Sequence, residues 1–288
     1  MNKRSGCNLT MNNSRRECFS TSQGVPSLPL RWILALATSA LPLVAGAGSA
    51  PGLGNLSMGS QIRLHESPRS VNPAPVIEAA TTVPGMDVSS YDGDVDWNTA
   101  WADGGRFAYV KATEGTYYIN SYFAQQYDGA YNVGMIRGAY HFANPADSSG
   151  AAQAQYFVAH GGGWSADGQT LPGVLDIEWD PYGSDCYGLS QSAMVSWISD
   201  FLTTYHSSTR RWPVIYTSAS WWSECTGSQA NFASTDPLWV AQYASSPGTL
   251  PYPWTNYSFW QYADSGELPG DQDLFNGSLS RLKALALR

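Results

Sequence analysis

Short apolar runs alternate, from residue 84 onward, with stretches whose apolar residues recur at helical spacing. The clearest helical stretch is 192–205, where Met194, Ile198 and Tyr205 lie on one face. Strands and helices that alternate every ~20 to 40 residues indicate a parallel sheet with crossover helices. The predicted strands of this part are 85–89, 107–113, 135–142, 173–179 and 213–217, and the predicted helices are 122–131, 151–159 and 192–205.

After residue 217 the helical pattern thins out, and three further strands are predicted at 238–243, 257–262 and 271–275. Five βα units followed by three strands with little helix predict an α/β fold, a modified TIM-like barrel of eight strands. An open, doubly wound sheet is the alternative. It is disfavoured because no glycine-rich phosphate loop follows the first strand.

Residues 1–50 have the pattern of a signal peptide. Basic residues precede an apolar stretch at 32–44, and small residues follow it, with cleavage expected after Ala47 or Ala50. The basic region is unusually long, which leaves the true start codon open. A retained membrane anchor is the alternative, but the apolar stretch is short and is broken by Pro42. We therefore expect a secreted, extracellular protein without stable membrane association.

Residues 51–83 are rich in Pro, Ser, Asn and Gly and follow neither a helical nor a strand period. This composition is typical of a flexible linker or of a pro-segment that is removed. The working domain is then 84–288, which is long enough to bury a substantial core. Two of the four cysteines, Cys186 and Cys225, lie in this domain. In an oxidising compartment we expect them to form a disulfide.

The composition narrows the class of protein. Residues 1–83 hold seven basic and three acidic side chains, so the net charge of −8 becomes −12 on residues 84–288. A sequence pI near 4.8 excludes nucleic-acid binding through a basic surface. Aromatic residues make up 13% of the chain, as many as the charged ones, which is typical of proteins that stack flat apolar faces of a ligand.

Acidic residues end the strands where a βα barrel carries its chemistry: Asp87, Asp176, Glu178, Asp271 and Asp273. On a strand, Asp176 and Glu178 would face the same side with Cα atoms ~7 Å apart. Such a pair should split its pKa values, so that one carboxyl keeps its proton and the other is ionised, as glycosidic cleavage requires. The alternative is Mg²⁺ bound for phosphoryl chemistry, but the domain offers few basic partners for phosphate. No metal and no other cofactor is predicted.

Six motifs occur in order between residues 84 and 280: 85–89 with 95–97, 109–115, 138–142, the pair Asp176/Glu178, 260–262, and Asp271-x-Asp273-x-Phe275. Together they resemble the glycoside hydrolase family 25 muramidases, the Chalaropsis-type lysozymes. The resemblance implies the same modified barrel. It also implies N-acetylmuramidase activity on the β-1,4 bond between N-acetylmuramic acid and N-acetylglucosamine of bacterial peptidoglycan.

The resemblance also implies roles for single residues. Glu178 would be the general acid, and Asp176 would stabilise the positive charge, by orienting the N-acetyl group of the substrate or, alternatively, as a covalent nucleophile. Asp87 and Asp271 or Asp273 would support them and bind sugar.

Tyr140 and Trp260 would border the sugar subsites by the same resemblance. Gly270 stands where the family usually has an apolar residue, so the last strand is expected to be irregular, and which of Asp271 and Asp273 faces the site stays open. A monomeric, non-catalytic protein that binds cell-wall carbohydrate on the same barrel is the alternative to a monomeric enzyme.

Overall fold

The computed structural model describes residues 56–66 and 82–287, all of which belong to the unit Ser49–Arg288. The predicted signal peptide, residues 1–50, lies outside the described residues. So does most of the stretch interpreted as a linker or pro-segment. Its described part, residues 56–66, contains a helix, α1 (Ser60–Glu66), that the sequence pattern did not predict.

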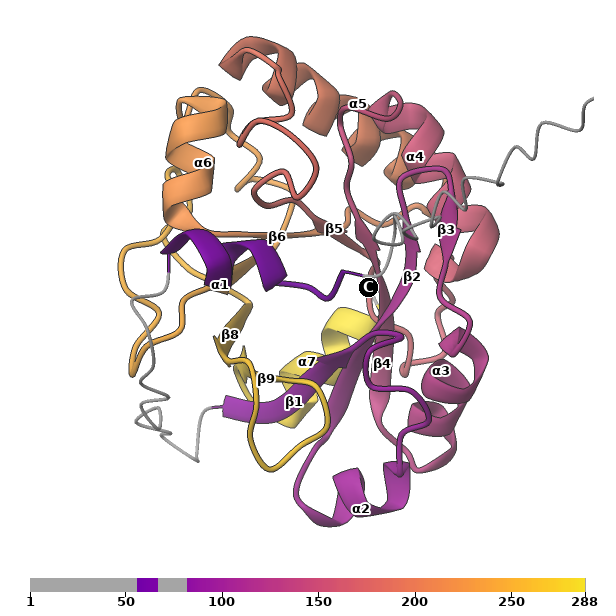
Figure 1. Ribbon diagram of the computed structural model, residues 1–288. Helices are drawn as coiled ribbons and strands as arrows, with labels where there is room; N and C mark the ends of the chain where they lie inside the picture. Colours follow the sequence, from indigo (N-terminus) through magenta and orange to yellow (C-terminus); the bar gives the residue numbers. More distant parts are fainter. Residues whose placement is uncertain (1–55, 67–81, 288) are drawn as a thin grey trace, which may run out of the picture. The chain divides into compact units, whose positions relative to one another are not determined.

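Eight strands close into a barrel, as predicted (Figure 1). The ring closes because the first strand pairs with both the second and the last. Neighbouring strands are parallel except at the last strand, which runs antiparallel to both of its neighbours. The strands are β1 (Thr82–Val88), β2 (Phe107–Glu114), β4 (Ile136–Phe142), β5 (Val174–Asp176), β6 (Val214–Thr217), β7 (Leu238–Ala241), β8 (Phe259–Ala263) and β9 (Asp271–Asn276). A short strand, β3 (Tyr118–Ile119), pairs only with β2.

A helix follows each of the first five barrel strands, which confirms the five predicted βα units. Three of these helices begin at a serine whose hydroxyl accepts a backbone N–H of the first turn, and one begins at Asp96, which does the same with its carboxylate. The helices are α2 (Trp97–Ala102), α3 (Phe123–Asn132), α4 (Gly150–Phe157), α5 (Gln191–Thr209) and α6 (Ala219–Thr226). A π-helical turn, η1 (Val158–Gly162), continues α4, and a last helix, α7 (Leu279–Leu287), follows β9.

Aromatic side chains fill the lower part of the barrel interior. The rings of Tyr109 and Trp239 lie 4.9 Å apart, and Phe259 packs 5.4 Å from both Phe107 and Trp239. All four side chains are fully buried. The aromatic content that suggested ligand stacking therefore serves, in large part, as the core of the barrel. These packed aromatic rings lie beneath the polar residues at the carboxyl ends of the parallel strands.

The predicted disulfide is present and joins Cys186, in the loop after β5, to Cys225 in α6. It connects the segments that follow two adjacent strands, β5 and β6, close to the end of the barrel where the acidic residues gather. Within residues 56–66 and 82–287, none of the helices is long and apolar enough to cross a lipid bilayer.

Candidate active site

Acidic residues from both ends of the domain meet at one end of the barrel. Asp87 lies at the carboxyl end of β1, and Asp271 opens β9. Because β1 and β9 are antiparallel, their register places Asp87 directly opposite Asp271, and Gly85 opposite Asp273. Side chains of directly paired residues lie on the same face of a sheet. The strands thus bring these carboxyl groups together above the packed aromatic rings.

Asp176 and Glu178 lie at the same end but not on one strand. β5 ends at Asp176, so Glu178 lies two residues beyond the strand, which corrects the predicted strand 173–179. Both side chains are fully buried. Burial raises the pKa of Asp176 well above its ordinary value, the charge of Glu178 raises it further, and Lys111 opposes this shift. Neither carboxyl oxygen of Asp176 has a hydrogen-bond partner among the described residues.

Burial likewise raises the pKa of Glu178 to about 7. Backbone N–H groups of Ile62, Gly59 and Gln61 and the charge of Arg63 act in the opposite direction. The sequence predicted one raised and one ordinary pKa. In the structure burial raises both, because both carboxyls are withdrawn from water in the same interior.

Gln261 holds the second pair of carboxylates. Its Nε2 donates to Oδ2 of Asp87 at 2.7 Å and to Oδ2 of Asp271 at 3.1 Å. Its Oε1 accepts hydrogen bonds from the hydroxyls of Tyr216, at 2.6 Å, and Tyr243. The side chain therefore connects two predicted site residues to two tyrosines that the sequence did not single out.

Gln261 points into the barrel, whereas its neighbour Trp260, predicted to border the sugar subsites, does not. Successive side chains of a strand point to opposite faces, so Trp260 lies on the outer face of β8. Its indole N–H donates to the backbone carbonyl of Gln242 at 2.8 Å. The structure does not bring Trp260 to the carboxylates. The alternation of β8 was the signal that pointed to Gln261, a polar residue in an otherwise apolar strand.

Asp271 and Asp273 both point into the barrel, because they are two residues apart on β9. Asp271 lies at the mouth, where Arg63 Nη1 is 2.9 Å from its Oδ2. Asp273 lies deeper and is fully buried, and its oxygens have no hydrogen-bond partner among the described residues. Burial and the neighbouring charges of Asp87 and Asp271 raise the pKa of Asp273 well above its ordinary value.

The expected irregularity of the last strand is wrong. β9 is continuous over six residues, and the register shift lies in β8, between Gln261 and Ala263. Gly270 has a φ of +68°, and a Cβ added there would lie 2.1 Å from the backbone oxygen of Asp87. Glycine stands at this position because β9 begins in close contact with the end of β1.

Tyr140 and Lys111 are two further residues of the barrel that carry polar groups near the carboxyls. Both are fully buried. The Tyr140 hydroxyl accepts a hydrogen bond of 3.2 Å from the backbone N–H of Met58. Lys111 Nζ lies 2.6 Å from Oε2 of Glu114 and also donates to the backbone carbonyl of Leu56. Tyr140, predicted to border sugar subsites, is thus covered by the segment at residues 56–66.

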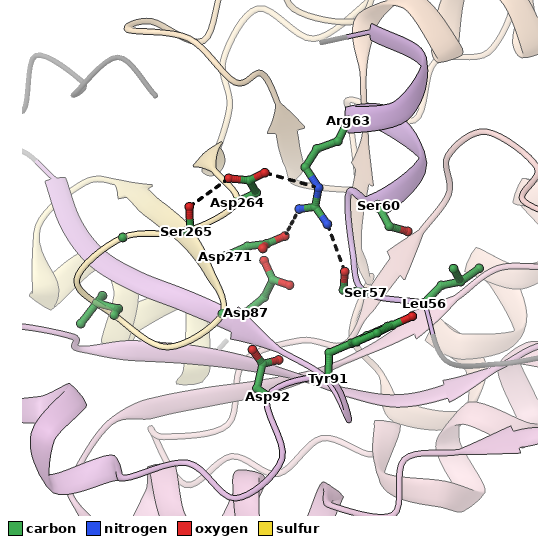
Figure 2. Close-up of a pocket in the computed structure, with 13 residues that line it drawn as sticks. Leu56, Ser57, Ser60, Arg63, Asp87, Tyr91, Asp92, Asp264, Ser265 and Asp271 are labelled. Atoms are coloured by element: carbon green, nitrogen blue, oxygen red, sulfur yellow. Dashed lines mark hydrogen bonds and ion pairs between the residues drawn. The ribbon is translucent and has the colours of Figure 1, made fainter. Parts of the chain in front are cut away.

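A cavity of about 510 Å³ lies beside the carboxylates (Figure 2). Asp87, Asp92 and Asp271 line it from the barrel. On the opposite side it is lined by residues that precede and belong to α1: Leu56, Ser57, Ser60 and Arg63. Figure 2 shows the Arg63 guanidinium directed at Asp264, Asp271 and Ser57. Among the described residues no group of three or more His, Cys, Asp or Glu side chains is arranged to bind a metal ion.

Buried carboxyl groups at the carboxyl ends of the parallel strands of a barrel are the arrangement found in βα-barrel glycoside hydrolases. Residues 86–271 match the model of the Glycosyl hydrolases family 25. The chain belongs to this family, which confirms the resemblance drawn from its motifs.

Similar proteins and solved structures support the same assignment. The chain is 44% identical to Lysozyme M1 of Streptomyces globisporus over 283 residues, which cover 94% of this chain and 95% of that protein. It is 49% identical to the N,O-diacetylmuramidase of Chalaropsis sp over 209 residues, covering 71% of this chain and 99% of the relative. Among solved structures, a muramidase from Acremonium alcalophilum is 60% identical, with a TM-score of 0.70, and covers 71% of this chain and 99% of its own.

Proposed function

We propose that the protein is a secreted lysozyme that hydrolyses the β-1,4 bond between N-acetylmuramic acid and N-acetylglucosamine in bacterial peptidoglycan. The observation that carries this proposal is the buried pair Asp176 and Glu178, at the same end of the barrel as the cavity that Asp87 and Asp271 line. The names of the relatives, lysozyme and muramidase, support the substrate class. The predicted signal peptide and the disulfide, which is typical of exported proteins, support secretion.

Glu178 acts as the general acid in this proposal. A carboxyl whose pKa is raised to about 7 is protonated in mildly acidic solution, and it can give its proton to the leaving glycosidic oxygen. Ordinary glutamates are ionised at the same pH and cannot do this.

Asp176 stabilises the positive charge that develops on the sugar. Its two oxygens are without hydrogen-bond partners among the described residues, so they can accept the N–H of the substrate's N-acetyl group and orient that group. Burial and the charge of Glu178 raise the pKa of Asp176, and Lys111 opposes this shift and so favours the ionised form that the role requires. A covalent glycosyl intermediate on Asp176 is the alternative course, and trapping such an intermediate would distinguish the two.

Asp87, Asp271 and Asp273 act as supporting carboxyls, and Tyr140 borders the sugar. Gln261 keeps Asp87 and Asp271 in place through its two N–H bonds, so that their remaining oxygens can accept sugar hydroxyls.

The test is a chemical assay of new reducing ends released from bacterial walls. We expect the chain to release N-acetylmuramic acid reducing ends, and Glu178→Gln to lower the rate by roughly 10²–10⁴-fold. Glu224→Gln is the matched control, because Glu224 lies exposed on α6. Wall binding without any release of reducing ends, also when residues 56–66 are displaced from Glu178, would show a carbohydrate-binding protein instead of an enzyme.

A further inference from the structure

Residues 56–66 place three backbone N–H groups on the proposed general acid. The N–H of Gly59 donates to Oε1 of Glu178 at 2.7 Å, and those of Gln61 and Ile62 donate to Oε2, each at 2.9 Å. Both oxygens are therefore acceptors, and these three bonds lower the pKa of Glu178, which favours the ionised form that has no proton to give. The segment also occupies the positions around both oxygens from which a glycosidic oxygen would take the proton.

The same segment covers further residues of the proposed site. Met58 donates its backbone N–H to the Tyr140 hydroxyl, and Arg63 forms an ion pair with Asp271. Residues 56–66 thus contact the acid, a sugar-bordering tyrosine and a supporting carboxylate at once. A sugar chain that reached these groups would have to displace the segment.

Its far end is also attached to the barrel. Glu66 Oε1 accepts hydrogen bonds from Trp179 Nε1 at 2.7 Å and from Ser218 Oγ at 2.5 Å. The ring of His65 stacks on Trp179, with centroids 5.0 Å apart and planes within 10°. These contacts reach the ends of β5 and β6, so the segment crosses the mouth from one side to the other.

Its apolar residues pack as part of the core. Met58 is 0% exposed and Ile62 is 1% exposed, and both belong to the same apolar cluster as the barrel interior. Burying two apolar side chains this completely stabilises the docked position of the segment. The segment is seated in the mouth by apolar contact as well as by charge.

Gly59 shows how closely the segment fits. Its φ is +76°, and an added Cβ would lie 2.0 Å from the Tyr243 hydroxyl, 2.5 Å from Gln261 Oε1 and 2.6 Å from the Tyr216 hydroxyl. Only glycine combines this backbone conformation with this approach.

We infer that residues 56–66 are an autoinhibitory segment, which occupies the active site in the full chain and must leave before the enzyme cleaves peptidoglycan. The inference rests on the proposed function, because it takes Glu178 as the acid. The interpretation of residues 51–83 as a removable pro-segment agrees with it.

The experiment compares four full-length chains: wild type, Gly59→Val, Arg63→Glu and Gly104→Val. Gly104 is the matched control, since its φ is also positive, at +102°, but no atom lies within 4 Å of an added Cβ. Two quantities are measured for each chain, the release of muramic acid reducing ends and the hydrogen exchange of the amides of residues 59, 61 and 62. Near-ultraviolet circular dichroism confirms that the barrel is folded.

We expect Gly59→Val to expose these amides and to raise the rate of wall cleavage about tenfold or more, the factor that corresponds to a loss of about 1.4 kcal/mol of docking free energy. Gly104→Val should match wild type in both measurements. Arg63→Glu, which sets a third negative charge beside Asp271 and Asp264, should act like Gly59→Val by an independent route.

The two hypotheses fail in different ways. If the amides become exposed and cleavage stays at the wild-type rate, the segment does not inhibit, and the inference is overturned while the proposed function stands. If the amides become exposed in both variants and no chain releases reducing ends, the proposed function is wrong. If neither substitution exposes the amides, the contacts described here do not hold the segment in place, and the inference is overturned on that ground.

Discussion

The backbone N–H of Gly59 donates a hydrogen bond of 2.7 Å to Oε1 of Glu178, across 119 residues of sequence. Glu178 is the residue whose proton the proposed reaction uses. This hydrogen bond therefore connects the group proposed to supply the proton with the segment proposed to withhold it in the full chain. The pH dependence of wall cleavage bears on both proposals, because the bonds from residues 59, 61 and 62 shift the pKa of the same carboxyl.

The rate of wall cleavage should fall as pH rises through about 7. Burial raises the pKa of Glu178 to about 7, so the protonated form that can act as acid is lost above this pH. For wild type we expect kcat/KM to fall about tenfold per pH unit on the alkaline side, since kcat/KM follows the ionisation of the free enzyme. The measurement is release of reducing ends from soluble wall fragments between about pH 5 and pH 9. A rate that continued to climb above neutral pH would assign the acid to another group.

The fold could be predicted from the sequence because buried parallel strands leave a strong signal. Most of the predicted runs are apolar, and all eight became barrel strands. The helix α1 escaped prediction because its seven residues are too few to show a helical period. Its stability comes from packing on the barrel and not from its own sequence pattern.

The site could be predicted only in part. The acids Asp87, Asp176 and Asp271 were found because they end or begin strands. Gln261 was missed although it lies beside a predicted residue, Trp260, because the motif drew attention to the aromatic side chain and not to the strand's alternation. The contacts of Glu178 with residues 59–62 could not be predicted, since nothing in a sequence relates a backbone N–H to a carboxylate more than a hundred residues away.

Gln261→Met should weaken both the site and the fold. The substitution keeps the size of the side chain but removes the donor to Asp87 and Asp271 and the acceptor for Tyr216 and Tyr243. Polar groups left unpaired in the interior cost about 1–3 kcal/mol, which we expect as a loss in the free energy of unfolding measured in urea. We also expect a lower rate of wall cleavage.

Gln261→Glu separates charge from packing at the same position. It sets a carboxyl between Asp87 and Asp271, and repulsion between like charges grows as these groups ionise. Its destabilisation relative to wild type should therefore increase with pH. A destabilisation independent of pH would mean that the hydrogen bonds of Gln261, and not the charges around it, decide the outcome.

Gly270→Ala should destabilise the chain more than Gly93→Ala. The two glycines have similar φ values, +68° and +60°, so both substitutions carry the strain of a left-handed backbone. Only at Gly270 does the added Cβ meet an atom, the backbone oxygen of Asp87 at 2.1 Å, whereas Gly93 has open space. Strain of this kind costs about 1–3 kcal/mol, so the difference between the variants should be of that order in thermal or urea unfolding. Equal losses in the two variants would show that β9 can shift away from β1 without cost.

Asp236 should make the stability of the whole protein depend on pH. Its side chain is 2% exposed, Oδ2 accepts a hydrogen bond of 2.6 Å from the Thr235 hydroxyl, and Oδ1 has no partner among the described residues. Burial raises its pKa from 3.8 to about 7, and the bond from Thr235 opposes this only in part. It lies just before β7, at the opposite end of that strand from the proposed site, so its titration can be studied apart from catalysis.

The sign follows from counting protons. Between about pH 4 and pH 7 the folded chain keeps a proton on Asp236 that the unfolded chain has already released, so the free energy of unfolding falls as pH rises, by up to about 1.4 kcal/mol per pH unit. Other buried carboxyls contribute slopes of the same sign, and the comparison with Asp236→Asn isolates this one, because the amide does not titrate. We expect the difference in unfolding free energy, wild type minus Asp236→Asn, to decrease through this window and to level off above about pH 7. Two parallel profiles in urea unfolding would mean that Asp236 reaches water and ionises with its ordinary pKa.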